Sequence, residues 1–169
     1  NLEDELKFQE VNSVVRFNGN VGQTLTTATG TEVFGSLVMA KTGGDLTLAS
    51  PIEVRTDLDL STGRIMNTAT ELVTMRAGSA ALNASDASFV HGPVQKIGNS
   101  DFTFPVGKGG SLRPCGLTGI TGLATGAFTA EYFPISAYTW GSAMEPTLDR
   151  VSDCEHWIID RTAGSGNAV

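Results

Sequence analysis

The stretch Val54-Arg55-Thr56-Asp57-Leu58-Asp59-Leu60 decides the fold, because apolar or neutral side chains alternate in it with charged ones. A β-strand needs this period of two to bury one face and leave the other in solvent. The same alternation appears in Leu46-Thr47-Leu48 and, after a shift, in Val73-Thr74-Met75. The sequence therefore predicts a row of half-buried strands.

The alternating units recur along the chain at a spacing close to twenty residues. One series of apolar positions lies 17 to 20 residues apart: Phe17, Phe34, Val54 and Val73. A second series, Leu46 and Ile65, follows glycine-containing turns. A unit this short cannot bury a core alone, whereas stacked coils of a β-solenoid can. Hairpins of a β-sandwich are the competing interpretation, and we favour the solenoid.

The solenoid hypothesis predicts which side chains of the stretch from about Val15 to Met75 lie inside: Phe17, Phe34, Leu46, Leu48, Val54, Leu58, Leu60 and Val73. The positions between them predict one outward face: Glu53, Arg55, Asp57 and Asp59. Neighbouring carboxylates make Asp57 and Asp59 a weak calcium candidate, since calcium prefers oxygen ligands. Arg55 beside them favours solvated ion pairs instead, so we expect no metal.

From about Phe102 onward the pattern changes to longer strand-like runs. These runs are Leu112–Ile120, Ala127–Pro134 and Cys154–Arg161. Three or four strands cannot complete a sandwich, which needs about seven. We therefore expect an incomplete sheet with an open edge beside Trp157 and Ile159, finished by residues beyond the chain or by a neighbouring chain.

Two further features of the C-terminal part predict sites. The loop from Ser136 to Arg150 has no strand period, so its aromatic residues Tyr138 and Trp140 are expected to be exposed and are our ligand-binding candidates. Cys115 and Cys154 are the only cysteines. For an exported protein we expect them to form a disulfide, with two free thiols as the alternative.

Composition excludes several classes of function. The net charge of −7 arises from 18 acidic and 11 basic side chains, and the basic ones are scattered, which disfavours nucleic acid and anionic membranes as partners. No nucleophile elbow or phosphate-binding loop occurs, and no pair of carboxylates is assembled for glycoside hydrolysis. We therefore expect neither an enzyme nor a cofactor.

Two junction motifs carry a resemblance to a known class of protein. They are Ser88-Phe89-Val90-His91-Gly92-Pro93-Val94-Gln95-Lys96-Ile97-Gly98 and Phe102-Thr103-Phe104-Pro105-Val106-Gly107. Further on, Phe128–Phe133 and Glu155–Arg161 add to it. Together these segments resemble the very large exported surface proteins of gliding, Bacteroidetes-type bacteria, in which such a junction joins a stack of short β repeats to an immunoglobulin-like sandwich.

The resemblance implies an all-β chain: a short β-solenoid followed by an incomplete Ig-like β-sandwich. We expect a polar cap or linker at 1–10, the solenoid at 11–90, a junction hairpin at 91–110 and the partial sandwich at 111–169, continuing beyond the chain.

The function that the resemblance implies is an extracellular structural or adhesive module at the bacterial cell surface, exported by type IX secretion, with a role in adhesion or gliding. Its expected partners are other domains of the same long chain or neighbouring copies, with surface glycans as a further candidate, and we expect no membrane insertion. The alternatives are a carbohydrate-binding module of a secreted polysaccharide-degrading enzyme and a strand-exchanging filament subunit.

Overall fold

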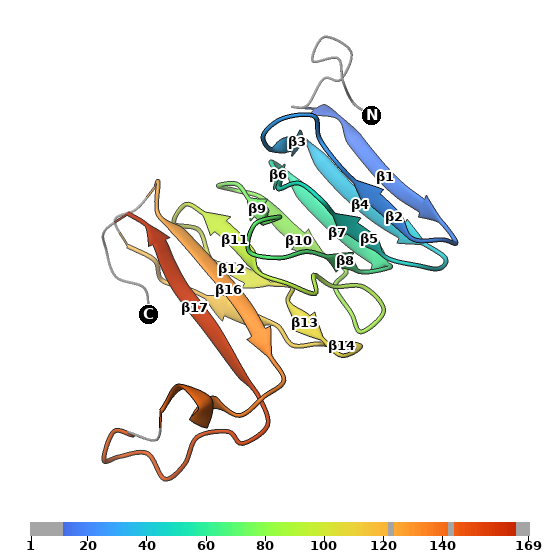
Figure 1. The fold of residues 1–169 in the computed structure, drawn as a ribbon. Helices are drawn as coiled ribbons and strands as arrows, with labels where there is room; N and C mark the ends of the chain where they lie inside the picture. The colour runs from blue at the N-terminus through green and yellow to red at the C-terminus, as the bar shows by residue number, and fades with distance from the viewer. Residues whose placement is uncertain (1–11, 122–123, 142–143, 165–169) are drawn as a thin grey trace.

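A computed structural model describes residues 12–121, 124–141 and 144–164 of the 169-residue chain. In this part the protein is nearly all β, as the sequence predicts (Figure 1). The polar cap or linker expected at 1–10 lies outside the described residues.

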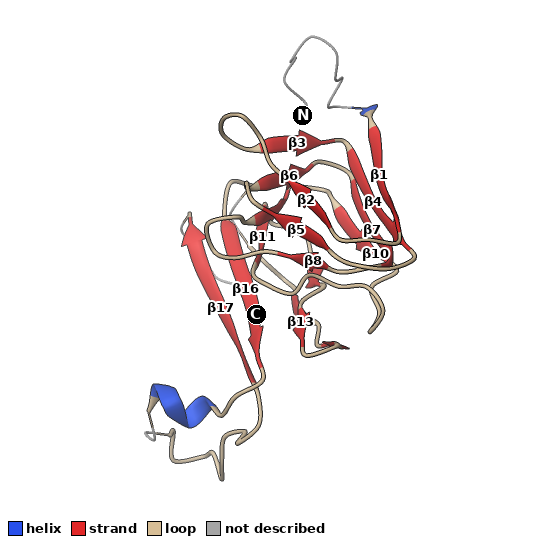
Figure 2. Cartoon of the chain, turned by 45° about the vertical axis from the view of Figure 1, so that its right-hand side comes forward, coloured by secondary structure: helices blue, strands red, loops and turns tan. Residues whose placement is uncertain are grey.

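Parallel strands stack into successive coils with three faces (Figures 1 and 2). The first face is a four-stranded sheet of β1 (Val14–Gly19), β4 (Ser36–Lys41), β7 (Asp57–Thr62) and β10 (Ala80–Leu82). The second face holds β2 (Gln23–Leu25), β5 (Leu46–Leu48) and β8 (Ile65–Met66). The third holds β3 (Glu32–Phe34), β6 (Ile52–Val54), β9 (Val73–Met75) and β11 (Val94–Ile97). The short β-solenoid is therefore confirmed.

The strand register confirms one predicted series and corrects the other. Leu46 pairs with Ile65 on adjacent coils, as their spacing predicts. Phe34 likewise pairs with Val54. Phe17 instead lies in β1 and pairs with Met39, while Val73 pairs with Ile52. The first series therefore mixed two faces of the solenoid, because the turns between strands differ in length from coil to coil.

The predicted inside positions form the core, with one exception. Leu46, Leu58 and Leu60 have no exposed surface, and the other members except Phe17 are also buried. Phe17 is only partly buried, since the first coil has a described coil on one side only. Stacking on both sides is what removes an inward side chain from water.

The four residues predicted to share one outward face lie on two faces. The chain turns between β6 and β7, where the amides of Arg55 and Thr56 donate to carbonyls of the preceding coil. Glu53 therefore stands on the third face, 3.3 Å from Arg55 and 3.5 Å from Arg76. Asp57 and Asp59 stand on the first face, in β7. The period of two was right within each strand and failed at the corner.

The solenoid extends past the expected boundary at residue 90. β11 pairs in parallel with β9 and completes a fourth coil, and Val90 bridges Ile65 and Val106. The expected junction hairpin at 91–110 is thus partly a solenoid coil. The short strands that follow form two small antiparallel pairs, β12 (Phe102–Phe104) with β15 (Cys115–Leu117) and β13 (Gly107–Lys108) with β14 (Ser111–Leu112).

The C-terminal hairpin continues the third face of the solenoid. β16 (Ala127–Phe133) pairs antiparallel with β11, and β17 (His156–Ala163) pairs antiparallel with β16. The resulting six-stranded sheet has the order β17-β16-β11-β9-β6-β3 (Figure 1). One core cluster reaches from Leu25 in the first coil to Tyr132 in β16. An Ig-like sandwich in this part stays a prediction.

Candidate functional site

The candidate site lies on the outer face of the β16–β17 hairpin, beside the 3-10 helix η2 (Ala137–Trp140). Phe133 and His156 face each other across the two strands. Their rings are stacked, with centroids 5.2 Å apart and planes 14° apart. Both side chains are on the sheet side that turns away from the core, because the alternate residue Tyr132 is buried.

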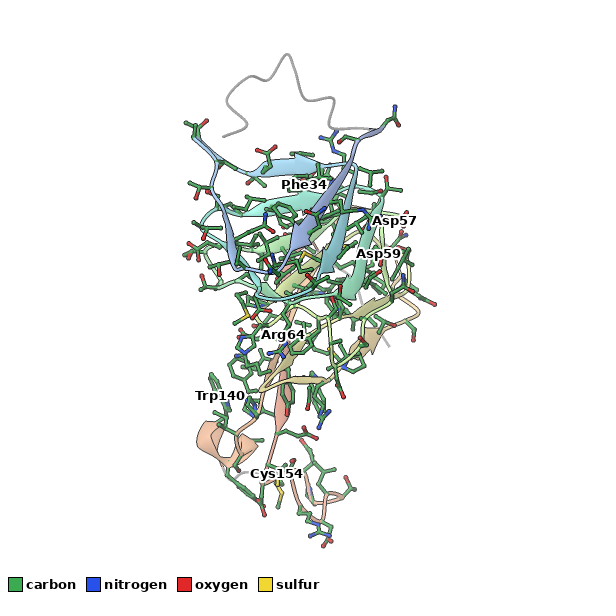
Figure 3. The ribbon with its side chains drawn as sticks, turned by 90° about the vertical axis from the view of Figure 1, so that its right-hand side faces the viewer. Phe34, Asp57, Asp59, Arg64, Trp140 and Cys154 are labelled. Carbon is green, nitrogen blue, oxygen red and sulfur yellow. The ribbon has the colours of Figure 1, made fainter. Side chains whose placement is uncertain are left out.

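Trp140 is fixed on this pair although 73% of it is exposed. Its indole N–H donates to Nε2 of His156 over 3.1 Å. The other ring nitrogen of His156, Nδ1, lies 3.0 Å from the carbonyl oxygen of Ile135. The two contacts together assign the proton of a neutral ring to Nδ1, since Nε2 must accept. Trp140 projects from the hairpin end of the molecule (Figure 3).

A lysine and a carboxylate complete the row of side chains. Nζ of Lys108 lies 2.7 Å from Oε1 of Glu131 and 4.3 Å from the centroid of the Phe133 ring. The lysine thus neutralises Glu131 and makes a cation–π contact in the same place. Phe133 thus contacts both Lys108 and His156, which joins these side chains into one row.

A shallow hollow of about 220 Å³ lies next to this row. Its walls come from two solenoid corners and from both hairpin strands: Ala69, Pro93, Thr129, Glu131, Phe133, Ile158 and Asp160. The walls are mainly apolar, and two acidic residues, Glu131 and Asp160, are among the residues that line them. The volume is below the range of sites for drug-sized ligands, so it suits one small ring or one long side chain.

The sequence predicted the exposure of Tyr138 and Trp140 correctly but did not identify the other residues of the candidate site. Tyr138 and Trp140 both lie in η2 and both are exposed, Tyr138 to 39%. Neither lines the hollow. The sequence reasoning missed Phe133, His156 and Lys108, although their alternation with buried neighbours was a usable signal for the first two. A ligand-binding role for Tyr138 and Trp140 stays a prediction.

The disulfide expected between Cys115 and Cys154 is absent, because both cysteines are free. Cys115 lies half-buried in β15, opposite Phe104, and burial raises the pKa of its thiol to about 11. Cys154 is exposed in the loop before β17 (Figure 3). Two lone cysteines in one region were not sufficient to bring their Sγ atoms together.

Among the described residues, no third carboxylate joins Asp57 and Asp59, the calcium candidate. Oδ1 of Asp59 accepts hydrogen bonds from Ser61 over 2.8 Å and from Asn83 over 2.9 Å. Within the described ranges, no group of three or more His, Cys, Asp or Glu residues is arranged to hold a metal ion. The surroundings of Asp59 fit a hydrogen-bonded turn better than a cation site.

The opposite face of the hairpin is anchored by a polar cluster. The hydroxyl of Tyr132 donates to Oε2 of Glu155 over 2.7 Å, and Nε of Arg113 lies 3.3 Å from the same oxygen. The hydrogen bond from Tyr132, and then Arg113, lower the pKa of the Glu155 carboxyl. The indole N–H of Trp157 donates to the Arg113 carbonyl over 2.8 Å. These contacts fix the start of β17 against the segment that follows β14.

The junction histidine is a packed residue. Burial, followed by the charges of Lys108 and Arg64, lowers the pKa of His91. Its ring stacks on Phe89 with centroids 6.4 Å apart. This environment disfavours the charged form of the ring.

Comparison with known proteins returns no relative: no family model, no curated protein and no solved structure matches the chain. In the parts that the structure describes, no helix has the length and apolarity that a membrane crossing requires.

Proposed function

We propose that this chain is an extracellular structural and adhesive module of a large bacterial surface protein, which spaces and displays neighbouring parts at the cell surface. One observation carries the proposal: a single sheet runs unbroken from the first coil to β17. Each solenoid coil adds about 4.8 Å of length, so the fold is a spacer whose length is set by its number of coils.

The distribution of burial supports a spacer more than a catalyst. Inward-facing side chains of the solenoid are shielded from solvent, and Leu37, Met39 and Leu58 are fully buried. The two solenoid lysines with almost no exposure donate hydrogen bonds to oxygen atoms of the chain itself. Lys41 donates to the Val21 carbonyl and the Gln23 amide, each over 2.7 Å, and Lys96 donates to two backbone carbonyls. Buried cations used in this way join strands and turns.

The location is tested with antibodies against this chain on intact cells of the producing organism. We expect labelling of the surface, lost after brief protease treatment that leaves a cytosolic marker intact. Deletion of the coding region should lower attachment of cells to a surface, and its restoration should recover attachment. Exclusive recovery of the protein from the cytosol would contradict the proposal.

A carbohydrate-binding module is the second candidate, favoured by the position of Trp140. An exposed indole fixed by a hydrogen bond is a platform for a sugar ring, and Asp160 is among the residues that line the neighbouring hollow. Glycan-array binding that is lost in Trp140→Ala supports this candidate. Leu148→Ala is the matched control, because Leu148 is an exposed apolar residue of the same loop and its removal should leave binding unchanged.

A further inference from the structure

We propose that β17 is a docking edge for a second copy of this chain, with the two β17 strands pairing antiparallel about a two-fold axis. This docking edge follows from the structure of β17 and does not depend on the proposed location of the protein. β17 is the last strand of its six-stranded sheet, and no described strand lies beyond it (Figures 1 and 2). β17 has eight residues, and the edge that faces away from β16 exposes backbone donors and acceptors to another chain.

The hydrogen-bond pattern shows which residues offer their backbone at this edge. The amide of Gly98 donates to the carbonyl of Gly126 over 2.8 Å, which fixes the alternation of bonded pairs between β11 and β16. Residue 129 and its alternates 131 and 133 therefore turn their backbone toward β17, where they oppose 160, 158 and 156. The intervening residues Trp157, Ile159 and Arg161 consequently direct their N–H and C=O groups outward.

When two copies of β17 run antiparallel, the side chains of one copy match those of the other. In Glu155-His156-Trp157-Ile158-Ile159-Asp160-Arg161 the central residue is Ile158. When Ile158 faces Ile158 of the second copy, Trp157 faces Ile159, His156 faces Asp160 and Glu155 faces Arg161. Glu155 then faces an arginine and Asp160 faces the ring of His156. Cross-strand pairs of opposite charge, such as Glu155 with Arg161, stabilise a sheet.

Neighbouring registers lack this match. A shift that centres the axis on Ile159 places Asp160 opposite Ile158 and Glu155 opposite Ala163. A shift that centres it on Asp160 places two aspartates face to face, and like charges directly opposite each other destabilise a sheet. Among these three registers, the charge pattern favours the one centred on Ile158. In that register the outward residues Trp157 and Ile159 form the hydrogen-bonded pairs, as the edge geometry requires.

The side chains at this edge are also those that a partner would cover. Trp157 is 37% exposed and Ile159 is 40% exposed, although both lie on the face of the hairpin that carries the buried Ala130 and Tyr132. A second β17 places its own Trp157 and Ile159 beside them and extends the apolar face across the axis. Main-chain bonds and alternate side-chain contacts are the two components of recognition by strand addition.

The first test measures the mass of the full 169-residue chain by sedimentation as its concentration is raised. We expect a shift from 17.7 kDa toward twice that mass. Arg161→Glu places glutamates opposite each other twice, so it should raise the dissociation constant at least about tenfold. Arg150→Glu makes the same charge change in the exposed loop and should leave dimerisation unchanged. Equal weakening by both variants would overturn the assigned edge.

The second test reads the register directly, in a background with Cys115→Ser and Cys154→Ser. Ile158→Cys brings two cysteines face to face at the axis, so oxidation should give a covalent dimer. Asp160→Cys moves them roughly 13 Å apart along the strands and should not cross-link. A monomer at every concentration without a 158–158 cross-link would overturn the proposal. A longer chain in which a later segment protects the β17 edge amides would overturn it as well, by assigning the edge to that segment.

Discussion

The solenoid and the C-terminal hairpin share one sheet but bury their side chains to different extents. Leu58 in β7 has a strand on each side and no exposed surface. Ile159 in β17 lies on the core-side face of its strand and is still 40% exposed. The difference shows that alternation selects a face, whereas burial depends on what is stacked along the axis. Inward side chains of a repeat in the middle of the stack are covered by neighbours on both sides, whereas those of the last strand are covered on one side only.

The largest expected effect is the loss of stability when an inward-facing side chain is replaced by aspartate, compared between the solenoid and the hairpin. Leu58→Asp removes a buried leucine and leaves a carboxylate without a partner, so it should lower the free energy of unfolding by at least about 4 kcal/mol. Ile159→Asp should lower it by only about 1 kcal/mol, since the site is open to water. Urea unfolding at low protein concentration measures both values. Equal losses would mean that the hairpin is as closed as the solenoid.

A second comparison concerns glycines at the turns between coils. Gly44 has a φ of +66°, and a Cβ there would lie 2.3 Å from the amide nitrogen of Gly22. Gly44→Ala should therefore cost about 2–4 kcal/mol, because two coils must separate. Gly30 has a similar φ of +72° with nothing within 4 Å, so Gly30→Ala should cost only about 1 kcal/mol. Melting curves of the two variants separate backbone strain from contact between coils, and equal costs would contradict the close stacking.

The reactivity of the two thiols differs between the loop before β17, which carries Cys154, and the β12–β15 pair, which carries Cys115. Cys154 is exposed and Cys115 is half-buried with its pKa raised to about 11. Alkylation without reductant at neutral pH should therefore modify Cys154 more than about tenfold faster than Cys115. Peptide mapping over time gives both rates. A bond between the two cysteines in the purified protein would show that the disulfide predicted from the sequence forms after all.

The smallest expected effect is a pH dependence of the solenoid end at His91. The pKa of His91 is lowered in the folded chain from its ordinary value of 6.5. The unfolded chain therefore takes up the proton first as the pH falls through about 6.5. Stability contributed by the neutral ring is therefore present above that pH and is lost as the pH falls below it. Urea unfolding between neutral and mildly acidic pH should show a shallower decline for His91→Gln than for the natural chain. Identical slopes would exclude His91 as the cause.

The sequence predicted the parts of the fold that repeat. Leu46 and Ile65 revealed the coil spacing because both follow glycine turns, and the alternation around Leu58 gave the buried face correctly. Phe17 was assigned to the wrong face and Val73 to the wrong register, because a spacing counted along the chain does not reveal turns of unequal length. The boundary at residue 90 was wrong as well. Lys96 is a buried residue of β11, but a charged residue does not mark an inward position in the sequence.

The candidate site could be predicted from the sequence less well than the fold. Trp140 was expected to be exposed and is, because aromatic residues in a loop without a period have no face to bury. Its contact with His156 joins residues 16 positions apart, and the contact of Lys108 with Glu131 joins residues 23 apart. Such contacts depend on how β16 and β17 dock on the solenoid, which local patterns do not encode.

The most direct test of continuity between solenoid and hairpin is equilibrium unfolding in urea, followed by two probes in one sample. Both tryptophans, Trp140 and Trp157, belong to the hairpin region, so their fluorescence reports its unfolding, while the far-ultraviolet circular dichroism is dominated by the strands of the solenoid. If the six-stranded sheet is one cooperative unit, the two transitions coincide in midpoint and slope. A fluorescence transition that is complete while the solenoid signal is intact would show that the hairpin is a separate domain and would contradict the continuous sheet.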